Sequence, residues 1–445
     1  MSSNSRKNIL FIYTDQMHKF ALNCMGTSDI ITPNLDKLAE EGVLFRNTYS
    51  NCPICTPFRI NLITGMYTRQ TGMYRNESPI PKSCTTLMEE FRRGGYRTSF
   101  VGKWHVGDNG NGHVPEKHRR GWDEFIGFQC YNGFYKDVNF YDKDGEVRKF
   151  NRHRTDVATD LAIERLENLN GRRNETGQPF LLMLGYQAPH YPVQPAPKYE
   201  EMYEGVKVKR RPNMKEIDPY TGTASPRSPR PPENCPDFQR YGNDLDEYLR
   251  LYYALVTQID ANVGRIIQKL KDLGIYKETV IIFTSDHGDM QGSHGLKNKT
   301  HPYEESSGIP LIVRVPGGVK GIVSDGLIEA VDFFPSCLDY AGIDSDINLP
   351  GKSFAPFTMG EEQDLSKPVY SEIKSRKKWK MIRTPRYKLV VDGGWRKRPI
   401  MLFDMKEDPY EMNNLVDEEK YNSTVETLRR KIKQWQKYCR SHKKR

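Results

Sequence analysis

Apolar positions in this chain of 445 residues gather into four near-continuous runs, each followed or closed by charged or imidazole side chains. The runs are NILFIYTD (8–15), TSFVGKWH (98–105), PFLLMLGYQAPH (179–190) and TVIIFTSDHGD (279–289). Unbroken apolar runs of this length are typical of strands buried on both faces of a largely parallel sheet. The pattern therefore predicts four buried strands of one sheet.

Segments with helical periodicity lie between these runs. Residues 32–42 place Pro33 at the first helical position after a threonine N-cap and end at Gly42. Residues 83–95 predict a second helix, and residues 243–274 predict a long third one. Alternating strands and helices indicate an α/β fold with a largely parallel central sheet flanked by helices.

The pattern changes near residue 366. Three short strand patterns separated by turns precede an amphipathic helix, over residues 367–373, 378–392, 400–411 and 422–438. We therefore predict an α/β domain over residues 1–365 and a smaller C-terminal α+β subdomain over residues 366–445. The subdomain would hold an antiparallel sheet and a terminal helix.

Chemically active side chains follow each of the four predicted strands. These side chains are Asp15, Lys103, His105, His190, Asp286 and His287. Open α/β sheets bind ligands beyond the carboxyl ends of their strands, so four such coincidences predict one site. Asp15 with Gln16, and Asp286 with His287, form a plausible divalent-metal site, in which oxygen ligands suit calcium or magnesium and the imidazole favours manganese or zinc. The alternative is that the two Asp residues only cap helices or form turns.

The charge of the chain is basic and clustered. Lys and Arg number 67 against 57 Asp and Glu, for a net charge of +10. Basic residues gather in a Pro-rich segment, 205–236, which is predicted to be an inserted loop, and at the C-terminal end. A basic surface suits acidic partners such as polysaccharides, although an excess of this size can also serve solubility alone. Because no recognised nucleic-acid-binding module accompanies the basic residues, we expect no nucleic-acid partner.

The composition also bears on the compartment. Eight scattered cysteines show no disulfide-framework spacing, which favours a reducing compartment. No run approaches the roughly 20 apolar residues of a membrane span, and the apolar run near the N-terminus, ILFIY, is too short for a signal-peptide core. We expect a cytoplasmic protein as the sequence is written, or a periplasmic or secreted one if an export signal has been removed.

Two cysteines lie three positions apart in SNCPICTPFRINLITG (50–65). A C-x-x-C redox pair normally opens a helix of a thioredoxin-like unit, and a zinc site needs a second pair of Cys or His nearby. The chain is far too long for a bare thioredoxin fold, and no second pair lies close by. Neither reading therefore fits Cys52 and Cys55.

The stretch instead matches, position by position, the sulfatase signature C-x-P-x-R with a following Thr-Gly. The matching residues are Cys55, Pro57, Arg59, Ile63, Thr64 and Gly65. Further family blocks occur in the family's order: NILFIYTDQ, TPNLDKLAEEGVLFRNTYS, GKWHVG, APHYP, SDHGDMQGSHGL, KTHPYEES and LFDMKEDPYEMNNL. The chain thus resembles a type I, formylglycine-dependent sulfatase of the alkaline phosphatase superfamily over essentially its whole length, apart from the insert 205–236.

This resemblance implies that a separate maturation enzyme oxidises Cys55 to formylglycine, while Cys52 takes no part. The hydrated aldehyde would supply one hydroxyl to attack sulfur and a second whose deprotonation expels sulfate. The metal, most readily Ca²⁺ with Mn²⁺ as an alternative, would be held by Asp15, Gln16, the modified Cys55, Asp286 and His287. Cys55 is also predicted to begin a helix, whose free N–H groups favour an anionic group.

The resemblance implies further roles for matching positions. Arg59 would anchor the modified side chain, and Lys103 and Lys299 would bind sulfate oxygens. His105 would be the base that releases sulfate, and His190 would bind sulfate or protonate the departing alcohol. Taken alone, each is more often a solvated or packed residue. Candidates for substrate binding are Asn76, His294, Lys297, which could replace Lys299, and the insert residues Lys207, Arg210 and Arg211.

The chain departs from the commonest pattern of the family at two positions. Many sulfatases have Asp where this chain has Gln16, and Asn where it has His287. The set found here resembles that of the choline sulfatase and phosphonate monoester hydrolase branch and of several bacterial sulfatases. Such a site should prefer a singly charged group, either a sulfate monoester or a phosphate or phosphonate diester.

Three functional hypotheses follow. The first is a formylglycine sulfatase acting on a sulfated sugar of an acidic glycan, as in glycosaminoglycan degradation, because cations of the insert, including Arg227 and Arg230, follow His190 in the chain. The second is a phosphonate monoester or phosphodiester hydrolase with the same site. The third is a catalytically silent glycan-binding homologue. A flexible solvated loop is the alternative reading of the insert.

Overall fold

The computed structural model describes residues 6–107, 110, 112–130, 133–214, 244–374, 378–394 and 398–443. The predicted insert therefore lies partly outside the described residues, and Arg227 and Arg230 lie wholly outside them. No helix within the described ranges is both long enough and apolar enough to cross a membrane.

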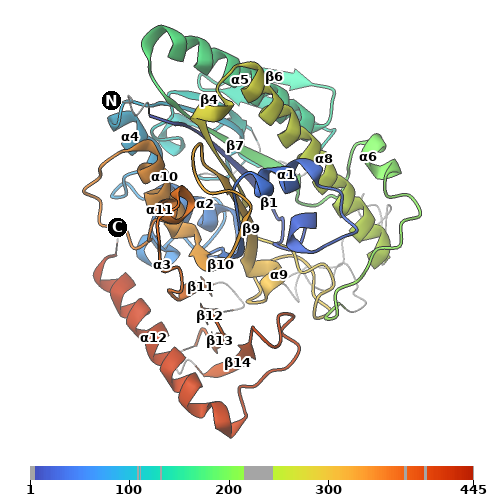
Figure 1. Ribbon diagram of the computed structural model, residues 1–445, viewed down its shortest axis with the longest axis vertical. Coiled ribbons are helices and arrows are strands. Elements are labelled where there is room, and N and C mark those ends of the chain that lie inside the picture. Colours follow the sequence, from blue (N-terminus) through green and yellow to red (C-terminus); the bar gives the residue numbers. More distant parts are fainter. Residues whose placement is uncertain are drawn as a thin grey trace.

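A mixed sheet of ten strands forms the centre of the molecule (Figure 1). In spatial order the strands are β10 (Ile322–Glu329), β2 (Val43–Tyr49), β9 (Gly308–Arg314), β8 (Thr279–Ser285), β1 (Asn8–Asp15), β7 (Phe180–Pro189), β3 (Arg97–Lys103), β4 (Glu124–Phe128), β5 (Val138–Asp142) and β6 (Val147–Phe150). The run β8-β1-β7-β3-β4 is parallel throughout, while β9 and the β5–β6 edge are antiparallel to their neighbours.

The four predicted strands are confirmed, and they are neighbours in the sheet as β8, β1, β7 and β3. Leu10 of β1 pairs with Leu182 of β7 on one side and Ile281 of β8 on the other, so the four carboxyl ends lie along one edge. Beyond β3 the chain turns sharply, because His105 adopts a positive φ of 51°. The candidate site residues therefore lie along this edge, either as the last residues of strands, such as Asp15 and Lys103, or on the connections just past them.

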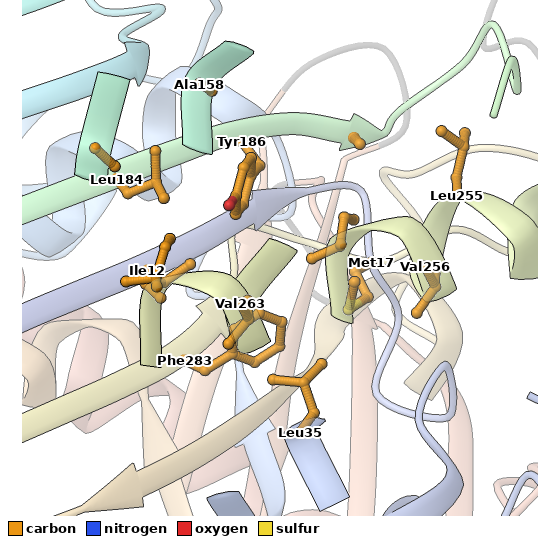
Figure 2. Close-up of a cluster of buried hydrophobic side chains, with 14 of the residues drawn as sticks. Ile12, Met17, Leu35, Ala158, Leu184, Tyr186, Leu255, Val256, Val263 and Phe283 are labelled. Carbon is orange, nitrogen blue, oxygen red and sulfur yellow. The ribbon is translucent and has the colours of Figure 1, made fainter. Parts of the chain in front are cut away.

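Helices cover both faces of the sheet. One face packs against α1 (Pro33–Glu40), α5 (Arg154–Thr176), α6 (Pro197–Glu201) and α8 (Leu245–Asp272), and the other against α2 (Cys55–Thr64), α4 (Leu87–Arg93), α10 (Phe333–Ala341) and α11 (Ala355–Met359). Alternate residues of β1 enter the two cores: Ile12 faces α8, where it meets Val263 (Figure 2), and Phe11 packs on Phe333 of α10. Strands buried on both faces explain the unbroken apolar runs.

The predicted helices are present, and each is a few residues shorter than the predicted range. Residues 32–42 form α1, residues 83–95 form α4 with Thr86 as its N-cap, and residues 243–274 form α8 with Asp244 as its N-cap. Two short helices, α3 (Thr68–Thr71) and α9 (Glu304–Ser307), complete the larger layer structure. The predicted α/β architecture is therefore confirmed.

A second, four-stranded antiparallel sheet lies at the C-terminal end of the chain. Its strands, in order, are β11 (Val369–Ile373), β12 (Trp379–Arg383), β13 (Tyr387–Asp392) and β14 (Pro399–Asp404), and α12 (Asn422–Ser441) covers them. Trp435 of α12 stacks on Tyr370 at 4.9 Å between ring centroids and meets Tyr67 edge-on at 5.5 Å. Helix α12 therefore packs against the C-terminal sheet and also against the start of α3 in the larger layer structure. The predicted domain boundary at residue 365 stays a prediction.

Candidate active site

Two buried carboxylates share one guanidinium at the edge of the large sheet. Asp15 is the last residue of β1, and Asp286 directly follows β8. Arg59 Nη2 lies 3.1 Å from Asp15 Oδ2 and 3.1 Å from Asp286 Oδ2, while its Nη1 donates to the carbonyl oxygens of Lys103 and Trp104 at 2.5 and 3.1 Å. Buried charges need such partners, because an unpaired one costs several kcal/mol. Arg59 therefore holds the two carboxylates together.

A lysine completes the set of charges around Asp15. Lys103, the last residue of β3, places its Nζ 2.6 Å from Asp15 Oδ2, and neither side chain is exposed. Burial alone would raise the pKa of Asp15, but the cations around it, Lys103 foremost, hold that pKa well below its usual value. The carboxylate is therefore ionised and available as a ligand.

Cys55 is the first residue of α2, and its thiol lies at the centre of the cluster. Its Sγ is 3.2 Å from His287 Nε2, 3.2 Å from Lys299 Nζ and 3.6 Å from Asp15 Oδ1. Burial, with the negative charge of Asp15, raises the pKa of the thiol to about 11. An unmodified Cys55 is therefore a protonated, weakly nucleophilic thiol.

The predicted metal ligands converge on the same point. Ligand atoms of Asp15, Cys55, Asp286 and His287 all lie within 4.8 Å of one another. His287 Nδ1 donates to the carbonyl oxygen of Gly288 at 3.0 Å, which leaves the Nε2 lone pair facing the cluster. Gln16 Oε1 lies 3.2 Å from Lys299 Nζ, next to Cys55. Carboxylate and amide oxygens with one imidazole fit a divalent cation, and they do not by themselves select calcium over manganese.

The two other predicted histidines flank the cluster. His190 Nδ1 donates to the carbonyl oxygen of Tyr191 at 2.6 Å, so its Nε2 is the atom that lies 3.4 Å from Lys299 Nζ. His105 is 8% exposed, and its Nδ1 has no hydrogen-bond partner among the described residues. Burial, together with the nearby Lys299 for His190 and Lys103 for His105, holds the pKa of each imidazole well below its usual value, so both are neutral at neutral pH.

The predicted substrate-binding residues are less closely grouped. Asn76 Oδ1 accepts from the backbone N–H of Thr56 at 3.1 Å, which ties it to the first turn of α2. Lys297 Nζ lies 5.4 Å from the ring centre of Tyr248. Among the insert residues, Lys207 is exposed, Arg210 Nε pairs with Asp246 at 2.7 Å, and Arg211 Nε lies 3.6 Å from Glu305. Of these three insert residues, Arg210 and Arg211 are therefore already paired with acids of the protein.

His294, which is half-buried, lies in a second cluster with the buried Glu305 and Glu411, and the potential ligand atoms of the three residues also come within 4.8 Å of one another. Asn213 occupies the space between them: its Nδ2 is 2.8 Å from Glu305 Oε1, 3.0 Å from the carbonyl oxygen of Tyr410 and 3.3 Å from His294 Nε2. The ring of His294 stacks on Tyr303 at 3.9 Å. An amide donor therefore already fills the position that a cation would take.

A neighbouring group of buried charges, the junction cluster, joins the large sheet to the C-terminal sheet. It consists of Lys19, Glu304, Lys388 and Glu411, and Lys388 Nζ lies 3.0 Å from Glu304 and 2.6 Å from Glu411. Lys19 also contacts Glu304, which accepts a further hydrogen bond from Tyr49 at 3.0 Å. Every acid of this cluster therefore has a protein cation beside it.

Asp289 and Tyr248 belong to the site although the sequence analysis gave them no role. Asp289 Oδ2 accepts from Gln16 Nε2 and from the Tyr248 hydroxyl, both at 2.7 Å. The SDHGD motif contained Asp289, and its repetition of Asp286 three positions later was the available signal. Nothing in the pattern of α8 distinguished Tyr248 from its neighbouring tyrosines.

Comparison with known proteins identifies the family. A sequence model of the Sulfatase family matches residues 7–343, and the model described as N-sulphoglucosamine sulphohydrolase, C-terminal, matches residues 292–438. An N-acetylglucosamine-6-O-sulfatase of Bacteroides thetaiotaomicron is 29% identical over 505 residues, which cover 97% of this chain and 86% of the relative.

Solved structures extend the comparison. A protein solved in complex with its substrate, D-glucosamine-2-N,6-O-disulfate, superposes with a TM-score of 0.84 at 26% identity, over 99% of both chains. The phosphonate monoester hydrolase of Agrobacterium radiobacter has a TM-score of 0.77 at 24% identity, over 98% of this chain and 96% of that one. The second similarity shows a common fold.

Proposed function

From the premise that this chain belongs to the sulfatase family, we propose that it hydrolyses a sulfate ester on a sugar of an acidic glycan, with formylglycine made from Cys55 and a divalent metal, Ca²⁺ first. The observation that carries the proposal is the placement of Cys55 Sγ, 3.2 Å from both His287 Nε2 and Lys299 Nζ. The thiol stands where the oxygen-bearing group of formylglycine would be. The sugar part rests on two relatives, one named as an N-acetylglucosamine-6-O-sulfatase and one solved with a disulfated glucosamine.

The metal would be held by Asp15, Gln16, Asp286 and His287, and it would supply Lewis-acid activation of the attacking hydroxyl. Formylglycine, once hydrated to a geminal diol, would supply both that hydroxyl and the second one, whose deprotonation would release sulfate. Arg59 keeps the two carboxylates in place through its paired 3.1 Å contacts. These residues prepare the nucleophile.

The remaining side chains would act on the substrate. Lys299 and Lys103 present ammonium groups to sulfate oxygens, where the charge develops in the transition state. His190 would carry the proton for the departing alcohol on Nε2, 3.4 Å from Lys299 Nζ, once the negative charge of bound sulfate favours its imidazolium form. The neutral His105 would accept the proton that releases sulfate.

A first experiment tests the modified residue. The tryptic peptide from Asn47 to Arg59, taken from protein made beside a competent maturation enzyme, should be about 18 Da lighter at Cys55, and unchanged at Cys52. An intact Cys55 in cells that convert a control sulfatase would contradict the proposal and favour a silent glycan-binding homologue.

A second experiment tests the reaction and the substrate. We expect release of sulfate from N- and O-sulfated glucosamines, and faster turnover of an aryl sulfate than of an aryl phosphonate or phosphate diester. The phosphonate hydrolase alternative is favoured by the likeness in fold and by the ligand set of Gln16 and His287. Faster turnover of the diester would replace the first proposal with this alternative, and activity on aryl sulfate without activity on any sulfated sugar would remove the glycan part.

A further inference from the structure

Asp289 uses both of its carboxylate oxygens within the site. The side chain lies in the connection after β8 and is 1% exposed. Its Oδ1 accepts from the backbone N–H groups of Asn298 and Gln291 at 2.9 and 3.2 Å. Its Oδ2 accepts from Gln16 Nε2 and from the Tyr248 hydroxyl, both at 2.7 Å. This one buried acid therefore contacts both the predicted metal ligand Gln16 and Asn298, the residue directly before Lys299.

These contacts fix which end of the Gln16 amide faces the cluster. An ionised carboxylate only accepts hydrogen bonds, so it selects the NH₂ end of the amide. The carbonyl end, Oε1, is then turned toward Lys299 Nζ, 3.2 Å away, beside Cys55. Gln16 itself has a φ of 70°, a conformation that a non-glycine residue adopts only when its surroundings impose it.

The same carboxylate also positions Lys299. The hydrogen bond from Asn298 N to Asp289 Oδ1 holds the residue directly before Lys299, and Asn298 has a positive φ of 68°. Lys299 Nζ then reaches Cys55 Sγ at 3.2 Å. Asp289 thus sets two neighbours of the thiol without touching the thiol itself.

We propose that Asp289 is a positioning residue that locks the Gln16 amide with its oxygen toward the cation, and so turns a neutral glutamine into a metal ligand. This inference rests on the proposed function, because it assumes that a divalent cation binds in the cluster. Supporting residues of this kind typically contribute 10- to 100-fold to metal affinity.

The test exchanges donor and acceptor between the two side chains. In Asp289→Asn, an NH₂ group would face the NH₂ of Gln16, and the glutamine amide would turn its donor toward the cation. The double variant Gln16→Glu with Asp289→Asn restores one donor facing one acceptor and keeps the total charge. The amide oxygen that this variant carries at position 289 can still accept from the two backbone N–H groups.

Affinity for Ca²⁺ and for Mn²⁺ would be measured by equilibrium dialysis on chelator-treated full-length protein, and by the metal-dependent rise in Tm. We expect the dissociation constant to rise about 10- to 100-fold in Asp289→Asn and to return to within about fivefold of wild type in the double variant. Tyr248→Phe, which removes the other hydrogen bond to Asp289 Oδ2, should change it less than about threefold. If Asp289→Asn does not fold, recovery of folding and affinity in the double variant supports the proposal.

Three results would overturn it. Wild-type metal affinity in Asp289→Asn would show that Asp289 is not needed to orient the Gln16 amide. Equal loss of metal affinity in the single and double variants would show that Asp289 has a purely structural role. A wild-type protein that binds neither cation would overturn the proposed metal and this inference with it. The last result is distinguished from the first two because it is seen before any substitution is made.

Discussion

The catalytic cluster around Cys55 and the junction cluster around Glu304 are built from the same kinds of residue, yet they differ in how their acceptors are used. In the junction cluster, Lys388 Nζ lies between Glu304 and Glu411, and a backbone N–H donates to Glu411 at 2.7 Å. In the catalytic cluster, the Nε2 of His287 and Oδ1 of Asp15 both face a thiol. Buried acids paired with protein cations therefore indicate a metal site only where a further oxygen, such as Asp15 Oδ1, faces other ligand atoms instead of a cation.

Replacing Cys55 should distinguish the two clusters most strongly, because it should abolish activity while leaving stability nearly unchanged. We expect Cys55→Ala to lower kcat at least about 10⁵-fold, because removal of a nucleophile abolishes the chemical step. Tm should change by less than about 3 °C, since the junction cluster is intact. Turnover of an aryl sulfate and a thermal melt would measure both.

The matched control is Cys52→Ala. Cys52 is also fully buried, but it packs in the apolar cluster with Tyr49 and Ile54 rather than beside the carboxylates. It should keep wild-type kcat in the folded fraction. Loss of chemistry in Cys52→Ala would contradict the assignment of Cys55 as the reacting residue.

Lys388→Met should lower stability and leave kcat nearly unchanged, which is the reverse of the result expected for Cys55→Ala. Removing one partner of a buried charge pair typically costs about 3–5 kcal/mol of unfolding free energy, because the carboxylates are left without their cation. The kcat of the protein that remains folded should stay within about threefold of wild type. Urea denaturation measures the first quantity and active-site-normalised turnover the second. Lys420→Met, on a lysine that is 68% exposed, should leave the urea midpoint essentially unchanged.

Lys299→Met tests the charge beside the thiol. We expect kcat to fall about 10²- to 10³-fold, as for loss of one group that stabilises transition-state charge. Lys297→Met, two positions away, should lose less than about fivefold, because Lys297 lies over the ring of Tyr248. Equal losses in the two variants would show that Lys297 shares the role, and a larger loss in Lys297→Met would exchange the assignments.

A pH series tests the junction cluster through a smaller effect, the change in unfolding free energy as Glu411 titrates. Burial raises the pKa of Glu411 to about 7 against the attraction of Lys388, and repulsion from Glu304 and Glu305 adds to the rise. The folded state therefore binds this proton more tightly than the unfolded state, and the resulting stability is present below about pH 4.5 and is lost as the pH rises through 7. Between pH 5 and 8, wild type should lose on the order of 2 kcal/mol relative to Glu411→Gln.

Urea midpoints of the two proteins at each pH provide the measurement. The exposed Glu362→Gln serves as control and should follow wild type at every pH. A difference between wild type and Glu411→Gln that does not change with pH would show that Glu411 titrates alike in the folded and unfolded states.

Much of this architecture could be predicted from the sequence, for a physical reason. Strands β1, β3, β7 and β8 are buried on both faces, so their apolar runs are unbroken, and their polar ends mark the site. By contrast, α5 was not predicted, although it spans 23 residues, because Arg, Glu and Asn interrupt its apolar stripe. The edge strands β5 and β6 are short and partly exposed, which removes the same signal.

The site was predictable as far as its residues end strands or belong to recognisable motifs. Asp15, Cys55, Arg59, Lys103, Asp286, His287 and Lys299 were named from the sequence, and the structure brings them together. The pairing of Arg211 with Glu305, and the amide of Asn213 beside His294, depend on contacts between segments far apart in the chain. Such contacts leave no trace in local spacing.

The enclosure of Cys55 has a consequence in time. The folded protein exposes only 1% of this residue, and Lys299, which helps to enclose it, is added to the chain about 240 positions later. At roughly 5–20 residues per second, a ribosome would need roughly 12–50 s to cover that distance. An enzyme that oxidises Cys55 would therefore work on a segment already made but not yet enclosed, during an interval set by the order in which the ribosome adds these residues.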